Sequence, residues 1–341
     1  MAEASVLDVG IVVLATLAVW KGSEWLESAS DDLATYYGLP QVVQGAIVAA
    51  VGSSFPELAS VVFAAVFAGS LDLGVGAIVG SAIFNVLVIP ALAGLLTDDP
   101  IESNRTLVYK EAQFYMLAVS VLLITFALAV IYHPVTTAAS ELVGLVTRPL
   151  ALLPLGLYGL YIFIQLQDTG DYEAESPPAD LDVAAQWGYL VAGLVVILVA
   201  IERLVHSVDL IGQSVGVPAF IMGVTILAGA TSLPDALVSV RAARDDRGVA
   251  SLANVLGSNT FDLLVAIPVG VLIVGHAAID FAMAVPMFGV LTAATVLLFT
   301  VLRTGLALTE RESAALLVAY VVFIAWVVAE TTTTVVNVLP N

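Results

Sequence analysis

The chain contains no cysteine and only two lysines, Lys21 and Lys110, among its 341 residues. The lack of cysteine excludes a disulfide framework and a thiolate metal site. Lysine and arginine together number 10 against 29 aspartates and glutamates, which gives a net charge of −19. Such acidity argues against binding to nucleic acid or to an anionic membrane surface. It would suit a salt-loving organism, where acidic surfaces are common.

Charged residues of either sign are also scarce, at 11% of the chain against 60% hydrophobic residues. A soluble globular protein carries roughly 25% charged residues, so the composition predicts an integral membrane protein. The first residues, Met1 to Asp8, lack the basic region and the small-residue cleavage site of a signal peptide. We therefore expect the first apolar run to be retained as a helix.

Long apolar runs follow one another along the chain. A spanning helix needs about 20 apolar residues, and ten segments are long enough: 7–30, 39–69, 72–96, 105–132, 138–166, 183–208, 216–243, 249–275, 278–302 and 312–338. Between the fifth and sixth segments, residues 167–182 form an acidic stretch with a Pro-Pro pair. This polar composition predicts a solvated linker between two halves.

Basic residues are concentrated at the odd-numbered connections between these segments. The third, seventh and ninth connections are flanked by Arg105, Lys110, Arg241, Arg244, Arg247, Arg303 and Arg311, whereas the even-numbered connections carry no lysine or arginine. Because cytoplasmic loops are enriched in basic residues, we expect the odd-numbered connections to be cytoplasmic and both termini to be extracellular. The predicted location is the plasma membrane, crossed several times.

The two halves repeat each other at an offset of 178 residues. Matching pairs include Gly38 with Gly216, Pro40 with Pro218, Ser54 with Ser232 and Pro56 with Pro234, and after a one-residue slip Gly80-Ser81 with Gly257-Ser258. Because each half holds an odd number of spans, the second half enters the membrane inverted, which is a transporter architecture. The sequence thus predicts an all-α polytopic membrane protein of ten transmembrane helices, built as two inverted five-helix repeats with broken helices at the midplane. The repeats would cover residues 1–166 and 183–341, joined by a cytoplasmic linker at 167–182.

The most informative residues are two short signatures at matching positions of the repeats. The first reads Gly52-Ser53-Ser54-Phe55-Pro56-Glu57 and the second Ala230-Thr231-Ser232-Leu233-Pro234-Asp235. Each proline lacks an N–H and breaks or kinks its helix, and broken backbone at membrane depth is tolerated where it lines a cavity. A carboxylate within an apolar span is a candidate functional group. Freed carbonyls, hydroxyls and carboxylates are hard oxygen ligands, which suit Na⁺ and Ca²⁺.

If the turns at the signatures are helical, their spacing groups the polar residues of each repeat on one face. The pairs that stand four residues apart are Ser53 with Glu57, Thr231 with Asp235, Ser81 with Asn85, and Ser258 with Asp262. Three of these residues, Glu57, Asp235 and Asp262, are acids with no basic neighbour in the sequence. Such a group favours cations, and the alternative that one acid holds a proton stays open.

Single features of the spans have structural interpretations as well. A lone serine or threonine in a span commonly bonds a backbone carbonyl or packs helices closely. Gly76 and Gly80 form a GxxxG pattern, which is more typical of a packing face than of a ligand site. His133, His206 and His276 are unclustered at predicted span ends, so we assign no metal to them. Only the combination of the two signatures predicts a site.

The signatures resemble those of the sodium/calcium exchanger family, part of the cation/calcium exchanger superfamily, whose inverted repeats carry G-[ST]-S-x-P-[ED] and a following G-S-x-x-x-[ND]. This chain has GSSFPE with GSAIFN in residues 38–90 and ATSLPD with GSNTFD in residues 216–268. The resemblance implies a secondary active antiporter, not an enzyme, that exchanges Na⁺ for Ca²⁺ by alternating access without a cofactor. The implied ion ligands are Glu57 and Asp235 as central carboxylates, oxygens of Ser53, Ser54, Thr231 and Ser232, backbone carbonyls of Ala50 and Ala228, and the side chains of Asn85, Asp262, Ser81 and Ser258. The implied partners are the two ions and the lipid bilayer, and a monomeric state stays open.

Two departures from the family pattern concern selectivity. Ala230 stands where the second signature usually has glycine, and Asp235 is one methylene shorter than glutamate. Cation selectivity and potassium dependence therefore stay open. A Ca²⁺/H⁺ antiporter, or an antiporter of another divalent cation, is the alternative within the same superfamily.

A function from another class is an intramembrane aspartyl protease that uses Asp235 and Asp262. Such enzymes need an aspartate in a Gly-x-Gly-Asp setting, whereas Asp262 follows Asn259-Thr260-Phe261, and Glu57 would have no role. An intramembrane serine protease would need a histidine within a span, and none is well placed. A passive channel would show flux without coupling to a second gradient, so a flux assay distinguishes it from an exchanger.

Overall fold

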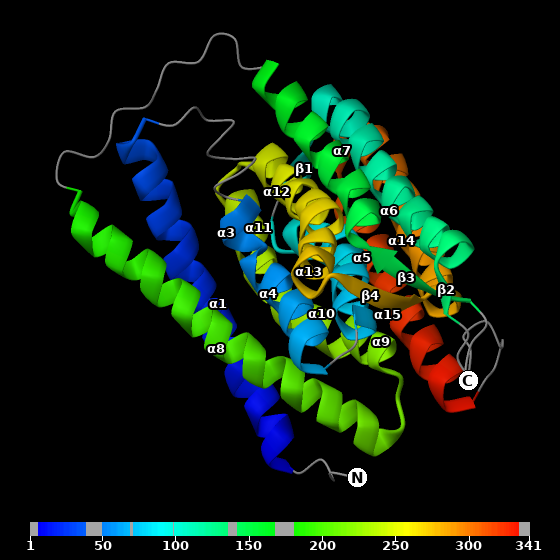
Figure 1. Ribbon diagram of the computed structural model, residues 1–341. Coiled ribbons are helices and arrows are strands. Elements are labelled where there is room, and N and C mark those ends of the chain that lie inside the picture. Colours follow the sequence, from blue (N-terminus) through cyan, green and yellow to red (C-terminus); the bar gives the residue numbers. More distant parts are fainter. Residues whose placement is uncertain are drawn as a thin grey trace.

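Helices make up most of the computed structural model (Figure 1), which describes residues 6–38, 50–68, 71–97, 99–135, 142–167 and 181–333. Among these residues, eight helical segments are long and apolar enough to cross a membrane. They are α1 (Val6–Tyr36), α5 (Leu71–Leu95), α6 (Ala112–Tyr132) with the preceding π-helix η3 (Thr106–Glu111), α7 (Arg148–Gln167), α8 (Val183–Val215), α12 (Gly248–Phe261) continuing into α13 (Ile267–Val274), α14 (Phe281–Arg303) and α15 (Glu310–Thr333). The prediction of a multi-pass membrane protein is confirmed.

A ninth apolar segment is bent at the second signature. It consists of α9 (Ala219–Met222), the π-helix η4 (Gly223–Leu227), α10 (Ala228–Thr231) and α11 (Leu233–Arg244), with a bend of 46° between α10 and α11. Ser232 stands at the bend, and Pro234 occupies the first turn of α11, where a proline needs no amide hydrogen. The predicted helix break at the second signature is confirmed.

The first signature is broken in the same way. The short helix α3 (Ala50–Ser53) ends before Ser54, and α4 (Phe55–Phe63) begins with Pro56 in its first turn and continues into the π-helix η2 (Ala64–Ala68). Glu57 and Asp235 therefore lie in the first turns of α4 and α11, where the helix dipole favours a negative charge. The remainder of the predicted span 39–69, at 39–49 and 69, lies outside the described residues, as do residues 168–180 of the predicted linker.

Two of the predicted spans begin too early, because a strand precedes each helix. In the predicted span 138–166, the strand β3 (Val143–Thr147) comes before α7, and β4 (His276–Asp280) likewise comes before α14. Together with β2 (Pro134–Val135), these strands form an antiparallel sheet in the order β2-β3-β4. Hydrophobicity alone does not separate a short apolar strand from the end of a helix, and the valines and threonine of β3 favour a strand.

A second pairing joins β1 (Ile101–Glu102) to β5 (Ala307–Leu308) in antiparallel register. Like the sheet that contains β3 and β4, it connects segments from the two halves of the chain. The all-α prediction therefore describes the apolar segments, while short strands at the ends of helices join the halves.

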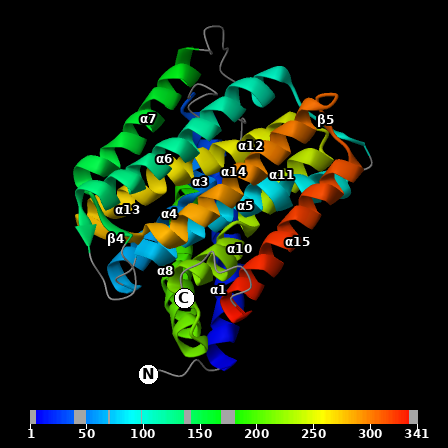
Figure 2. The same ribbon diagram turned by 90° about the vertical axis from the view of Figure 1, so that its right-hand side faces the viewer.

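The helices α1 and α8 pack along each other and form one side of the bundle (Figure 1). They approach closely at two glycines, since a Cβ atom on Gly193 would lie 2.7 Å from the carbonyl oxygen of Gly22. On another side, facing the viewer in Figure 2, lie α6, α14 and α15. Between these layers runs α5, whose side chains are buried along most of its length.

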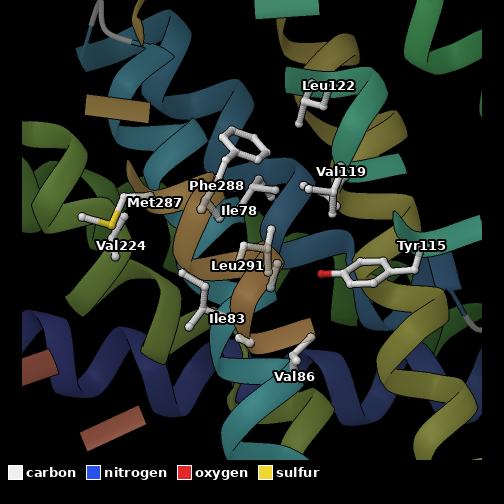
Figure 3. Packing of buried hydrophobic residues seen from close by; sticks show 14 of the residues in the cluster. Ile78, Ile83, Val86, Tyr115, Val119, Leu122, Val224, Met287, Phe288 and Leu291 are labelled. Atoms are coloured by element: carbon white, nitrogen blue, oxygen red, sulfur yellow. The ribbon is translucent and has the colours of Figure 1, made fainter. Parts of the chain in front are cut away.

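Apolar side chains from both halves of the chain fill the space around α5 (Figure 3). The cluster includes Ile78, Ile83 and Val86 of α5, Tyr115, Val119 and Leu122 of α6, Val224 of η4, and Met287, Phe288 and Leu291 of α14. Figure 3 shows the Tyr115 hydroxyl pointing inward from α6. The Tyr115 hydroxyl thus brings a polar atom into a largely apolar layer beside the central helix.

Gly76 and Gly80 bring the backbone of α5 against the second half of the chain. A Cβ atom on Gly76 would lie 2.2 Å from the carbonyl oxygen of Phe220, and one on Gly80 would lie 2.3 Å from that of Val224. No side chain fits into these gaps, so the interpretation of the GxxxG pattern as a packing face is confirmed. Because η4 leads directly into α10, this contact places the second signature against α5.

Candidate cation site

Ten of the predicted site residues have buried side chains, each at most 2% exposed. They come from the two broken helices and from the helix that follows each of them. The break between α3 and α4 carries Ser53, Ser54 and Glu57, α5 carries Ser81 and Asn85, the break between α10 and α11 carries Thr231, Ser232 and Asp235, and α12 with the following π-helix η5 (Asp262–Ala266) carries Ser258 and Asp262.

Hydroxyl groups join the two halves at this point. The hydroxyl oxygens of Ser53 and Ser258 lie 3.1 Å apart, and the Ser232 hydroxyl donates to that of Ser81 over 2.7 Å. Each signature therefore touches the serine on the helix that follows the opposite signature. The structure brings both repeats of the polar pattern into one buried region.

Asp235 is the acid with direct hydrogen bonds in this region. Its Oδ2 accepts from Asn85 Nδ2 at 3.2 Å, and its Oδ1 accepts from the Ser258 hydroxyl at 3.4 Å. The donors come from both halves of the chain, so Asp235 is held at the junction of the halves.

In the part of the chain that the structure describes, no hydrogen-bond donor reaches the other two acids, Glu57 and Asp262, and two neutral oxygens share this property. Among the described residues, ten buried polar side-chain atoms have no hydrogen-bond partner, and six of them belong to this region: both carboxylate oxygens of Glu57, both of Asp262, Oδ1 of Asn85 and Oγ of Ser54. The nearest hydroxyls, Thr231 beside Glu57 and Ser54 beside Asp262, make no hydrogen bond of ordinary geometry to these acids. An orphaned buried acceptor is costly, and six in one region make it a candidate cation site.

The three acids are near enough to interact without forming a single acidic cage. Glu57 interacts electrostatically with both Asp262 and Asp235. Within the described ranges, no group of three acidic or histidine side chains is close enough to hold one metal ion.

The two predicted carbonyl ligands lie at matching positions. Ala50 is the first residue of α3 and Ala228 the first of α10. The carbonyl of Ala228 accepts from the backbone N–H of Ser232 at 3.0 Å and from the Thr231 hydroxyl at 3.3 Å. Thr231 therefore donates its proton to the helix backbone, as the structural interpretation of span hydroxyls expects, while its oxygen keeps acceptor capacity.

Sequence reasoning missed two further residues, Asn259 of α12 and Tyr115 of α6. The side chain of Asn259 accepts from Asn85 Nδ2 at 3.0 Å, and its own Nδ2 donates to the Ala82 carbonyl and to the Tyr115 hydroxyl, each at 3.2 Å. Comparison of the repeats passed over Asn259 because its counterpart in the first half is Ala82. A buried amide in an apolar span was the available signal.

Comparison with protein families and known proteins gives a consistent result. The family model described as "Sodium/calcium exchanger protein" matches residues 7–167 and 185–329. CaxA of Alkalimonas amylolytica, a candidate antiporter by its description, is 31% identical over 323 residues, which cover 93% of this chain and 97% of CaxA. The sodium/calcium exchanger MaX1 of Methanosarcina acetivorans is 24% identical over 348 residues, which cover 92% and 96% of the two chains.

Shorter and structural matches agree with these. Human sodium/potassium/calcium exchanger 4 is 44% identical over 66 residues, which cover 19% of this chain and 11% of that protein. The solved structure of the sodium-calcium exchanger NCX_Mj, soaked with 10 mM Na⁺ and no Ca²⁺, has a TM-score of 0.62 at 23% identity and covers 94% of this chain and 98% of its own. The two proteins therefore share a fold.

Proposed function

Because the chain belongs to the sodium/calcium exchanger family, we propose that it is a secondary active antiporter that exchanges Na⁺ for Ca²⁺ across the membrane by alternating access. Membership in this family makes the chain a cation/calcium exchange transporter rather than an enzyme. The intramembrane protease interpretation of Asp235 and Asp262 is therefore dropped. The identity of the counter-ion, Na⁺, belongs to the proposal.

The observation that carries the proposal is the set of six buried acceptor oxygens that have no donor among the described residues. Ca²⁺ takes six to eight oxygen ligands, commonly carboxylates, carbonyls and waters. Hydroxyl, amide and carboxylate oxygens on two halves of the chain offer this chemistry, and an anionic substrate would be repelled by it. Bound cations would satisfy the orphaned acceptors and neutralise the repulsion between the acids.

In this proposal Glu57 and Asp235 are the central carboxylates shared by Ca²⁺ and Na⁺. Their position in the first turns of α4 and α11, one in each half, supports the assignment. The remaining proposed oxygen ligands come from Ser53, Ser54, Ser81, Asn85, Thr231, Ser232, Ser258 and Asp262, with the backbone carbonyls of Ala50 and Ala228. The ions are substrates, so they load from one side of the membrane and leave on the other.

The proposed architecture has ten transmembrane helices in two inverted repeats, residues 1–166 and 183–341, with a linker at 167–182. The matched helix breaks and the crossed serine contacts between the halves support it. We place the basic connections in the cytoplasm and both termini outside, in the plasma membrane. With this orientation, β1 and β5 pair on the cytoplasmic side, beside Arg105 and Arg311 of the basic connections.

Proton coupling is the second candidate, and the same orphaned acids favour it. The carboxylates of Glu57 and Asp262 lack donors among the described residues. Bound protons would satisfy them no less than bound Na⁺. A Ca²⁺/H⁺ exchanger would then use these acids as proton carriers. The two candidates differ in the gradient that drives Ca²⁺ movement, so one flux assay separates them.

The test uses purified protein in liposomes with radioactive Ca²⁺ outside. Vesicles loaded with Na⁺ and diluted into Na⁺-free buffer should accumulate Ca²⁺, because outward Na⁺ movement drives uptake. Vesicles with equal Na⁺ on both sides and a pH gradient should not accumulate it. Protein-free liposomes treated with a Na⁺ ionophore serve as the control for leakage and membrane potential.

Each of the other results assigns a different function. Uptake driven by the pH gradient alone would refute Na⁺ exchange and establish proton coupling. Ca²⁺ equilibration in the absence of both gradients would indicate a passive channel. Uptake that needs K⁺ together with Na⁺ would add potassium as a third transported ion.

A further inference from the structure

The amide of Asn259 and the hydroxyl of Tyr115 connect α6 to the candidate cation site. We propose that these two residues form a positioning pair, which turns the carbonyl oxygen of Asn85 toward the bound ion. This inference rests on the ion-exchange function proposed above. It adds two residues that the signatures do not contain, and neither of them would touch the ion itself.

The first step concerns the orientation of Asn259. Its Nδ2 donates to the backbone carbonyl of Ala82 and to the Tyr115 hydroxyl, both at 3.2 Å. A backbone carbonyl only accepts, so the amide nitrogen of Asn259 must be on this side. The opposite orientation would set its oxygen against the Ala82 carbonyl. The carbonyl oxygen of Asn259 therefore faces away from α6.

The second step is that the orientation of Asn259 determines the orientation of the Asn85 amide. The Oδ1 of Asn259 accepts from Asn85 Nδ2 at 3.0 Å, and the second hydrogen of Asn85 Nδ2 bonds Asp235 Oδ2 at 3.2 Å. Both donors of Asn85 are thereby used on acceptors. Its Oδ1 is left among the orphaned oxygens, together with those of Glu57 and Asp262. An acceptor in that place is a ligand for a cation, whereas the amide nitrogen there would repel it.

Burial makes this arrangement rigid. Asn85, Asn259 and Tyr115 are all 0% exposed, so water does not replace a lost partner. The Tyr115 hydroxyl points from α6 into the bundle beside Val86 and Leu291 (Figure 3). Removing it leaves one N–H of Asn259 without an acceptor and loosens the orientation of both amides.

The relay is asymmetric between the halves. Asn259 belongs to the second half, its counterpart Ala82 in the first half contributes only a backbone carbonyl, and the residue that is positioned, Asn85, belongs to the first half. The second half has Asp262 at the position of Asn85. Both oxygens of a carboxylate are acceptors, so Asp262 needs no partner to choose between two orientations. One relay is thus sufficient for the site.

A double-mutant cycle tests whether Asn259 acts through Asn85. The variants are Asn259→Ala, Asn85→Ala and the combination, and the readouts are Ca²⁺ binding by calorimetry in detergent and the KM and maximal rate of Ca²⁺ uptake. Asn259→Ala should weaken Ca²⁺ binding by about fivefold, the size expected for one net hydrogen bond, and raise KM more than it changes the maximal rate. In the Asn85→Ala background, the same change should have no further effect.

Tyr115→Phe removes a single oxygen atom and should weaken Ca²⁺ binding in the same direction but by less, again only when Asn85 is present. The Tyr115→Phe variant replaces Asn259→Ala in the experiment if Asn259→Ala lowers the yield of folded protein. Thr260→Val and Tyr161→Phe are the matched controls and should leave affinity unchanged. The Thr260 hydroxyl donates to the backbone carbonyl of Leu256, and the Tyr161 hydroxyl donates to Glu111, so neither of these bonds involves a proposed ion ligand.

The outcomes separate this inference from the proposed function. Wild-type protein that binds and exchanges Ca²⁺, together with an Asn259→Ala variant that binds it equally well, would overturn the positioning role alone. A loss that is equally large with and without Asn85 would show a structural role and also overturn it. Wild-type protein that binds no Ca²⁺ would overturn both.

Discussion

Replacing Glu57 with glutamine should abolish Na⁺-driven Ca²⁺ uptake while the protein still folds. The change keeps the size of the side chain and removes one negative charge from a fully buried position. A unit charge 4 Å from a divalent cation contributes about 8 kcal/mol at an effective dielectric of 20. If dehydration of the ion offsets half of this, Ca²⁺ affinity falls roughly 10³-fold.

The stability of this variant should distinguish loss of the site from loss of the fold. Glu57 is a buried acid that faces Asp262 and Asp235 and has no donor among the residues the structure describes. Neutralising it therefore removes an unpaired charge from the interior. Without added ions, the melting temperature of Glu57→Gln should therefore equal or exceed that of the wild type. Ca²⁺ at 100 times Kd should stabilise the wild type by about 2.7 kcal/mol and leave the variant unchanged.

Glu24→Gln is the matched control for this experiment. Glu24 lies on α1, pairs with Lys21 at 2.7 Å, and its side chain is 44% exposed, so the substitution should alter neither uptake nor the Ca²⁺-dependent shift. Near-normal exchange by Glu57→Gln would contradict the central role of Glu57. A variant that melts far below the wild type without ions would instead make Glu57 a structural residue.

The position of both signatures followed from local chemistry. A proline inside a helix lacks the N–H that would bond the carbonyl four residues back, so the breaks at Pro56 and Pro234 could be predicted without knowledge of the fold. Proline alone is not sufficient, because Pro90, Pro154 and Pro286 lie inside continuous helices. The prediction that Ser53 and Glu57 share a face assumed a helical turn between them, whereas the helix breaks at Ser54. Which hydroxyl meets which, such as Ser53 with Ser258, depends on how helices from the two halves cross, and no local rule supplies that.

Residues outside the repeat pattern escaped prediction for a different reason. Matching the halves keeps positions that recur, and Asn259 has no polar counterpart in the first half. Tyr115 stands in an apolar run of α6, where a tyrosine is ordinarily a packing residue. The strand β3 was assigned to a helix because five apolar or small residues before a long helix carry too little periodicity to separate the two.

Replacing Gly80 with alanine should destabilise the protein, although alanine has a higher helix propensity than glycine. Alanine is favoured over glycine by about 1 kcal/mol inside a helix. The added Cβ atom would lie 2.3 Å from the Val224 carbonyl oxygen and 2.7 Å from the Ala228 Cβ. These atoms belong to the backbone of η4 and to the first residue of α10, so the helices must separate. Overpacking of this kind costs about 1–3 kcal/mol, and more where backbone must move.

Gly289→Ala is the matched control, because the same glycine-to-alanine change should not destabilise the protein at this position. Gly289 lies in the middle of α14, and a Cβ atom there would meet nothing within 4 Å. Its melting temperature in detergent should equal or exceed that of the wild type, whereas that of Gly80→Ala should fall. Because Ala228 begins the helix that ends at the second signature, Gly80→Ala should also weaken Ca²⁺ binding. If both alanine variants were as stable as the wild type, α5 and η4 would not be in contact through Gly80, and the second signature would be placed by other contacts.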